Sequence, residues 1–178
     1  MSRTDKFVFT TLQIIAWVIF VGLCIEAGAL VVNFIYSLFK PEVVQNLYQK
    51  LDLSDMYERS KLAYFIMYGF ILGISILKAV MFYVVIRLVI KLDLSKPFNS
   101  FVSRQITLIS YYTLSIGLLS FIARESTKNL QQHGFIIDKL GQFWADSQAY
   151  ILMAAVIYLI ATIFKKGIEL QNENDLTI

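Results

Sequence analysis

A chain of 178 residues has room for one domain. Hydrophobic residues make up 57% of it and charged residues 16%, whereas a typical soluble domain is about half apolar and about a quarter charged. The net charge is only +3, and the basic residues do not cluster with aromatic ones, which argues against direct nucleic-acid binding.

Four apolar stretches separate the charged patches. A membrane-spanning helix needs about 20 residues, and the first two stretches are longer than that, while the last two are barely long enough. A soluble bundle would carry charges at every third or fourth position of each helix, and the first two stretches do not. The sequence therefore predicts an all-α, integral membrane four-helix bundle of one domain, 1–178. Its spans are expected at about 8–39, 62–91, 105–124 and 147–165.

The first stretch follows Arg3 and Lys6 and could be taken for a signal peptide. Its apolar run is too long for a signal peptide, so we expect an uncleaved first span. The single cysteine, Cys24, lies inside this span, has no partner for an internal disulfide and is expected to pack as a small apolar residue.

An even number of spans places both termini on the same side of the membrane. Lysine and arginine numbers barely separate the two sides. The basic residues near the termini and in Lys91–Arg104 lie in short segments beside helix ends, however, whereas acidic residues balance those of the other two loops. We therefore expect a multi-pass protein of the bacterial inner membrane with both termini in the cytoplasm.

The two outer loops carry apolar residues at helical spacing, in Pro41–Glu58 and in Asn129–Trp144. Pro41 suits the first turn of a helix. Both loops are therefore expected to contain short amphipathic helices on the outer face. Such helices either cover the end of the bundle or offer a docking surface for a peptide, a lipid or a partner.

Two ionisable residues, Glu26 and Lys78, lie deep in the first and second spans, where a charge is costly. Counted from the outer helix ends at about 1.5 Å per residue, their depths agree within one turn. We therefore expect an ion pair within the bundle, direct or bridged by water, Asn33 or Ser75. The pair is either structural or part of a proton, ion or ligand pathway.

Small and hydroxyl residues recur at helical spacing in all four spans and predict the faces along which the helices pack. On the third span this face runs through Ser110, Thr113, Gly117, Ser120 and Arg124. Gly69 and Gly73 form a G-x-x-x-G on the second span, about opposite Lys78. That face is expected to pack on a neighbouring span or on another protomer.

Signatures of catalysis are missing from the sequence. The single histidine, His133, lies in an outer loop, and no Cys/His cluster has the spacing of a metal site. Neither a nucleophile elbow nor a phosphate-binding glycine loop occurs. We therefore expect no enzyme, no catalytic residue, no metal and no cofactor.

The C-terminal segment Phe164–Ile178 reads as a helix end with cations at the inner interface, a glycine stop at Gly167 and a polar tail. No physical rule demands its particular order of residues. Together with Lys78-Ala79 and Lys96-Pro97-Phe98, this tail resembles a bacterial family of four-span membrane proteins, domain of unknown function 2975. The resemblance extends from about the first span to the C-terminus.

The resemblance implies a cytoplasmic partner, because members of that family are often encoded beside a small helix-turn-helix regulator. It offers no catalytic residue. The tail residues expected to bind such a partner are Glu169, Leu170, Glu173, Asp175 and Leu176.

Three functions remain open from the sequence. The leading hypothesis is a non-enzymatic sensor or scaffold of the membrane whose inner face, Lys91–Arg104 with Lys165–Ile178, binds a cytoplasmic regulator. The second is a small transporter or channel component that uses the polar centre at Glu26 and Lys78. The third is an accessory subunit of a larger complex or a homo-oligomer, with Gly69 and Gly73 at the interface. In each case membrane lipid surrounds the chain.

Overall fold

The computed structural model describes the backbone of residues 3–92, 97–137 and 139–175, and side chains within 7–92, 97–137 and 139–173. Four long helices dominate it: α1 (Arg3–Phe39), α3 (Lys61–Lys91), α4 (Ser100–Gln132) and α5 (Ser147–Asp175). Each is long and apolar enough to cross a membrane. The predicted all-α bundle of four spans is therefore confirmed.

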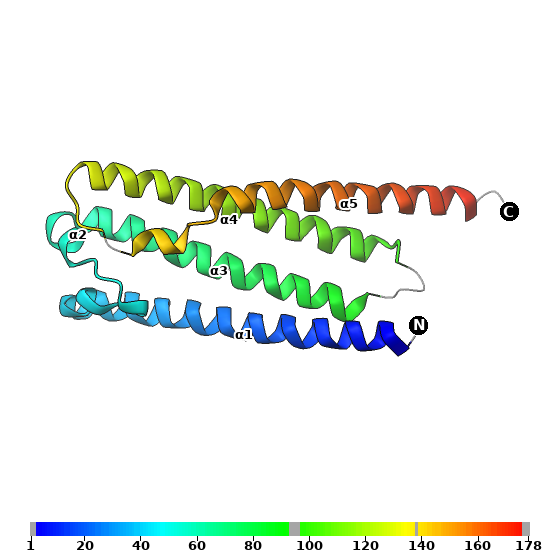
Figure 1. The fold of residues 1–178 in the computed structure, drawn as a ribbon, viewed down its shortest axis with the longest axis horizontal. Coiled ribbons are helices and arrows are strands. Elements are labelled where there is room, and N and C mark those ends of the chain that lie inside the picture. Colours follow the sequence, from blue (N-terminus) through cyan, green and yellow to red (C-terminus); the bar gives the residue numbers. More distant parts are fainter. Residues whose placement is uncertain (1–2, 93–96, 138, 176–178) are drawn as a thin grey trace.

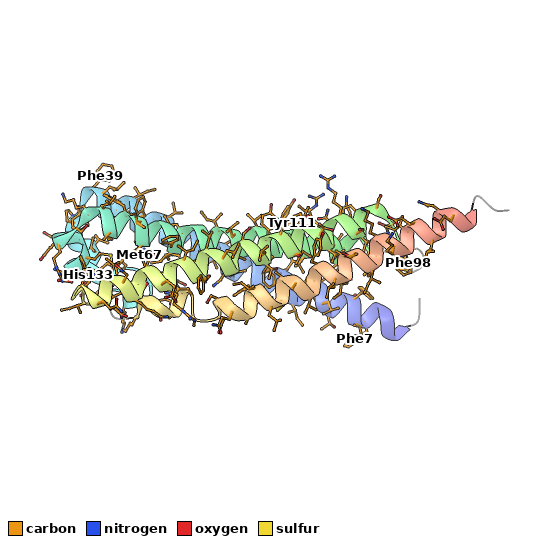
Figure 2. All side chains as sticks on the ribbon, turned by 90° about the horizontal axis from the view of Figure 1, so that it is seen from above. Phe7, Phe39, Met67, Phe98, Tyr111 and His133 are labelled. Carbon is orange, nitrogen blue, oxygen red and sulfur yellow. The ribbon has the colours of Figure 1, made fainter. Side chains whose placement is uncertain are left out.

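The long helices pack in chain order, α1 on α3, α3 on α4, and α4 on α5. In Figure 1, α1 begins and α5 ends at the same end of the bundle, as an even number of spans requires. Phe7 and Phe98 mark this end in Figure 2, while Phe39 and His133 mark the opposite one. The compartment that each end faces stays a prediction. After that predicted orientation, we call the end with Phe7 and Phe98 the inner end and the end with Phe39 and His133 the outer end.

Aromatic side chains and the polar groups they reach hold α1 against α3. The Tyr64 hydroxyl donates to the Ser37 hydroxyl at 2.7 Å, and the Tyr68 hydroxyl donates to the Leu30 carbonyl at 3.0 Å. Phe34 stacks on Tyr68 with 5.2 Å between ring centroids. Because the phenol groups find partners, these buried tyrosines avoid the cost of desolvating a polar group. Cys24, expected to pack, is exposed instead.

The small and hydroxyl residues of the stripe predicted for the third span are buried: Ser110, Thr113, Gly117 and Ser120. Arg124, the last residue of that stripe, is only partly buried. The Thr113 hydroxyl faces Met81 of α3, whereas Ser110 and Gly117 lie against α5. The Ser110 hydroxyl donates to the Ala154 carbonyl at 2.9 Å. A Cβ atom at Gly117 would lie 2.8 Å from Ile151 Cγ1, so only glycine allows this approach of the two helices.

Helix α5 starts beside the middle of α4, because its first turns contact Ser110 and Gly117 (Figure 1). The chain between α4 and α5 turns back along the outer half of the bundle. Its buried Leu140, Phe143 and Trp144 share one hydrophobic cluster with residues of the first outer loop and of α3. We call this outer assembly, residues 40–60 and 133–146 with the helix ends they cover, the outer cap.

Both outer loops contain short helices, as predicted. The first loop holds η1 (Pro41–Asn46), η2 (Tyr48–Lys50) and α2 (Ser54–Arg59), and η1 starts at the proline as expected. The second loop holds η3 (Leu140–Phe143).

The segment Asn129–Trp144 is not helical throughout. Helix α4 runs on to Gln132, Gly134 adopts a positive φ of 77°, and of the described residues from 133 to 144 only those of η3 are helical. The folded-back loop still buries Ile137, Leu140, Phe143 and Trp144, whereas Ile136 is exposed. The helical spacing alone could not separate a folded-back loop from a helix.

Candidate functional site

The predicted polar centre lies at one level of the bundle. Phe20 contacts Tyr83 at 6.1 Å between ring centroids, and Leu30 accepts from Tyr68. Glu26 on α1 and Lys78 on α3 both lie between these two contacts. Their depths in the bundle therefore agree within about one helical turn, as predicted from the sequence.

Matched depth does not produce the predicted direct ion pair. Among the residues that the structure describes, no ion pair within 4.0 Å joins Glu26 to Lys78. The contact between α1 and α3 runs through Leu30, Phe34 and Ser37, and Glu26 lies about 40° around the helix from Leu30. Counting residues from the helix ends determines how deep Glu26 and Lys78 lie along the helix axes. It does not determine the direction in which each side chain points.

The proposed bridging residues are not used for bridging. The Asn33 amide donates to the Ala29 carbonyl of its own helix at 2.8 Å. The Ser75 hydroxyl is buried without a hydrogen-bond partner, as is the Ser147 hydroxyl at the start of α5. Glu26 lies within electrostatic range of Tyr150 on α5. The hypothesis that this pair carries protons or ions through the bundle, which we call the relay hypothesis, therefore loses the direct contact that motivated it.

The two glycines of the G-x-x-x-G motif face open space. A Cβ atom built at Gly69 or at Gly73 meets no heavy atom within 4 Å, in contrast to one at Gly117. This face therefore does not pack closely on another span of the chain. Contact with another protomer stays a prediction.

The side chains of Arg59 and Asp55 join the two outer loops and form what we call the polar latch, which no motif in the sequence predicts. The Arg59 guanidinium donates to the Gly134 carbonyl at 2.6 Å and to the His133 carbonyl at 3.1 Å. It also lies 4.1 Å from the centre of the Phe135 ring. Asp55 pairs with Arg59 at 3.5 Å and accepts from the Ile136 N–H at 3.0 Å.

The inner end of the bundle brings together two segments far apart in the sequence. Phe98, in the turn before α4, lies 5.3 Å from Phe164 between ring centroids. A Cβ atom at Gly167 would lie 2.6 Å from Phe98 Cδ1. Gly167 therefore gives the Phe98 ring its place against α5 and does not act as the predicted helix stop, since α5 continues to Asp175. Lys96, the first residue of the Lys96-Pro97-Phe98 motif, lies outside the described residues.

The predicted partner-binding tail is the last part of this helix. Glu169 pairs with Lys166 at 2.7 Å, and Leu170 is 60% exposed. Glu173 is exposed. Asp175 is the last residue of α5, its side chain outside the described set, and Leu176 lies outside the described residues altogether. The inner face is therefore a helical tail anchored by Phe98.

These two inner segments carry the family resemblance, and the family comparison bears it out. The family described as "Protein of unknown function (DUF2975)" matches residues 48–178. The chain belongs to the DUF2975 family.

The DUF2975 match covers α3, α4, α5 and most of the outer cap, and it leaves out α1. It therefore takes in the latch between the outer loops, Lys78 and the contact of Phe98 with Gly167. Glu26 lies outside it, although the resemblance was expected to begin at about the first span. No curated protein and no solved structure matches this DUF2975 chain.

Proposed function

We propose that this four-span membrane protein is a non-enzymatic sensor or scaffold, in which the tail of α5 binds a cytoplasmic regulator and the outer cap responds to conditions on the other side. The observation that carries the proposal is the continuity of α5. One unbroken helix runs from Ser147, beside the cap residue Trp144, to Asp175 at the inner end.

A continuous helix can transmit a change in packing at one end to the other, because its backbone hydrogen bonds make it rigid. At the outer end, Trp144 and Ser147 are buried in or next to the cap. At the inner end, Phe98 holds α5 through Phe164 and Gly167. A shift of the cap would thus reach the tail as a movement of α5 against Phe98.

The tail has the chemistry of a recognition surface. Leu170 is exposed among Lys166, Glu169 and Glu173. An exposed apolar residue ringed by charges is a common pattern in protein interfaces, where an apolar centre gives affinity and a polar rim gives specificity. A small helix-turn-helix regulator, which the family resemblance implies, is the partner we expect.

Site-specific photo-crosslinking tests this surface with a matched control on the same helix. Leu152 and Leu170 are 69% and 60% exposed, and at about 100° per residue they lie on the same face of α5. A photoreactive residue at position 170 should capture a soluble protein in living cells, whereas one at 152 should capture lipid or membrane proteins. Equal yields of soluble adducts at both positions would contradict the proposal.

Deletion of Glu169–Ile178 supplies a second test. The shortened chain should still insert in the membrane, because α5 keeps its apolar stretch before Lys165. Its ability to co-purify the partner should be lost. A partner that still co-purifies would place the binding surface elsewhere.

A further inference from the structure

A pocket opens between the last turns of α3 and the first turns of α4, at the inner end of the bundle. Its volume is about 420 Å³. It is lined by Arg87, Ser100, Phe101, Arg104, Gln105 and Leu108.

Two arginines from different helices line this pocket, and none of the described residues that line it carries a carboxylate. Among the described residues, neither Arg87 nor Arg104 forms an ion pair. A third cation, Lys91, places its ammonium 5.2 Å from the centre of the ring of Phe101, which lines the pocket. Cations that share a pocket repel one another, and an anion between them removes that repulsion. Guanidinium groups fit phosphate oxygens in particular.

Gln105 adds a buried group that still needs a partner. Its side chain is 3% exposed, and its carbonyl oxygen has no hydrogen-bond partner. A buried acceptor of this kind is costly unless a donor reaches it. Helix α4 begins at Ser100, which lines the pocket, and the dipole at the N-terminus of a helix favours negative charge nearby. The ligand that suits the pocket therefore combines a negative charge with a hydroxyl donor.

The height of the pocket identifies the source of such a ligand. Ser100 and Phe101 follow Phe98, which packs on Phe164, and Phe164 directly precedes Lys165 and Lys166. Lysines at the end of an apolar helix mark the boundary between hydrocarbon and lipid headgroups. Leu108 lies about two turns deeper on α4 and gives the pocket an apolar end.

We propose that this pocket binds the phosphoglycerol headgroup of an anionic phospholipid. The phosphate lies between Arg87 and Arg104, a glycerol hydroxyl donates to the Gln105 carbonyl, and an acyl chain passes Leu108. Basic pockets between spanning helices are a known way of holding anionic lipids. The inference does not depend on the function proposed for the tail.

Lipid binding to the delipidated full-length chain in neutral detergent tests the proposal, by native mass spectrometry. The probes are phosphatidylglycerol, phosphatidic acid and phosphatidylcholine. Phosphatidic acid lacks the headgroup glycerol and its hydroxyls, and phosphatidylcholine is neutral overall. The variant is Arg87→Gln with Arg104→Gln. Both side chains are exposed, so the change should leave the fold intact. The matched control is Lys165→Gln with Lys166→Gln, which removes the same charge at the same height outside the pocket.

We expect phosphatidylglycerol to bind the wild-type chain about tenfold more tightly than phosphatidylcholine. The arginine variant should lose that preference, and the lysine control should keep it. An equal loss in both variants would reduce the effect to general surface charge and overturn the site. Gln105→Met should abolish the preference for phosphatidylglycerol over phosphatidic acid, and an unchanged preference would refute the role of the hydroxyl. Displacement of the lipid by an equal concentration of free glycerol phosphate would show a soluble ligand in place of a lipid.

Discussion

Phe98 and Gly167 contact each other so closely that the ring fills the place of a side chain on α5. The two residues are far apart in the chain, and each belongs to one of the two segments that carry the family resemblance. Their contact fixes the position of α5 relative to the turn before α4. It thereby unites the two inner segments in one surface.

Gly167→Val should therefore disturb the inner end of the bundle. The added Cβ would lie 2.6 Å from Phe98 Cδ1, a distance that forces the ring or the helix to move. Overpacking of this kind costs about 1–3 kcal/mol of unfolding free energy. Thermal unfolding in detergent should show a lower midpoint for the single variant. Adding Phe98→Ala should restore much of the loss, and a double variant as unstable as the sum of the two would argue against the contact.

Gly117→Ala should destabilise the protein, whereas Gly69→Ala should not. At Gly117 the new methyl group would lie 2.8 Å from Ile151 Cγ1 and push α4 from α5, whereas at Gly69 it meets no atom within 4 Å. Gly117→Ala should lower the unfolding free energy by about 1–3 kcal/mol. Gly69→Ala should leave it unchanged or raise it by up to about 1 kcal/mol, because alanine favours the helix. A strong loss at Gly69 would reveal a second protomer packed on that face.

Arg59→Gln should loosen the outer cap. The change removes charge-assisted hydrogen bonds to the His133 and Gly134 carbonyls and the contact with the Phe135 ring, worth about 1–3 kcal/mol in sum. Hydrogen exchange of the segment around Phe135 should speed up, as measured by mass spectrometry. Lys50→Gln removes an exposed cation of the same loop and serves as the control. Unchanged exchange in Arg59→Gln would show that the loops hold together without the latch.

The number, type and approximate ends of the spans follow from the sequence, because hydrophobic stretches of this length have few alternatives. The stripe of small residues through Gly117 was predictable for the same reason, since small residues permit close approach of helices. The length of each apolar stretch carries the first prediction, and one helical periodicity carries the second.

Contacts between distant segments were beyond that reasoning. Arg59 meets backbone carbonyls more than 70 residues away, and no spacing rule marks carbonyl acceptors. Glycine often ends helices, so the sequence around Gly167 suggests a helix stop. Close packing of Phe98 against α5 requires glycine at this position for a different reason, because a Cβ atom would clash with the ring. The direction of Glu26 and Lys78 depends on how α1 and α3 rotate about their axes, which depth alone does not determine.

The final prediction concerns Glu26 and Lys78, whose charges share a level without forming an ion pair. Glu26→Gln and Lys78→Met should each change the unfolding free energy, because each removes a charge from a mostly apolar helix. The coupling between them should be small, within about 0.5 kcal/mol of additivity, since neither side chain depends on the other for a salt bridge.

A double-mutant cycle, with unfolding followed in detergent, measures this coupling directly. Breaking a buried pair by removing one partner costs about 3–5 kcal/mol, and the second change then recovers much of it. Such recovery would mean that the two side chains meet in the membrane and would return support to the relay hypothesis. Asn33→Ala is the control, because its amide bonds within its own helix and should couple to neither charge. Additive losses in all combinations would instead assign each charge its own surroundings, with the long lysine side chain reaching toward water.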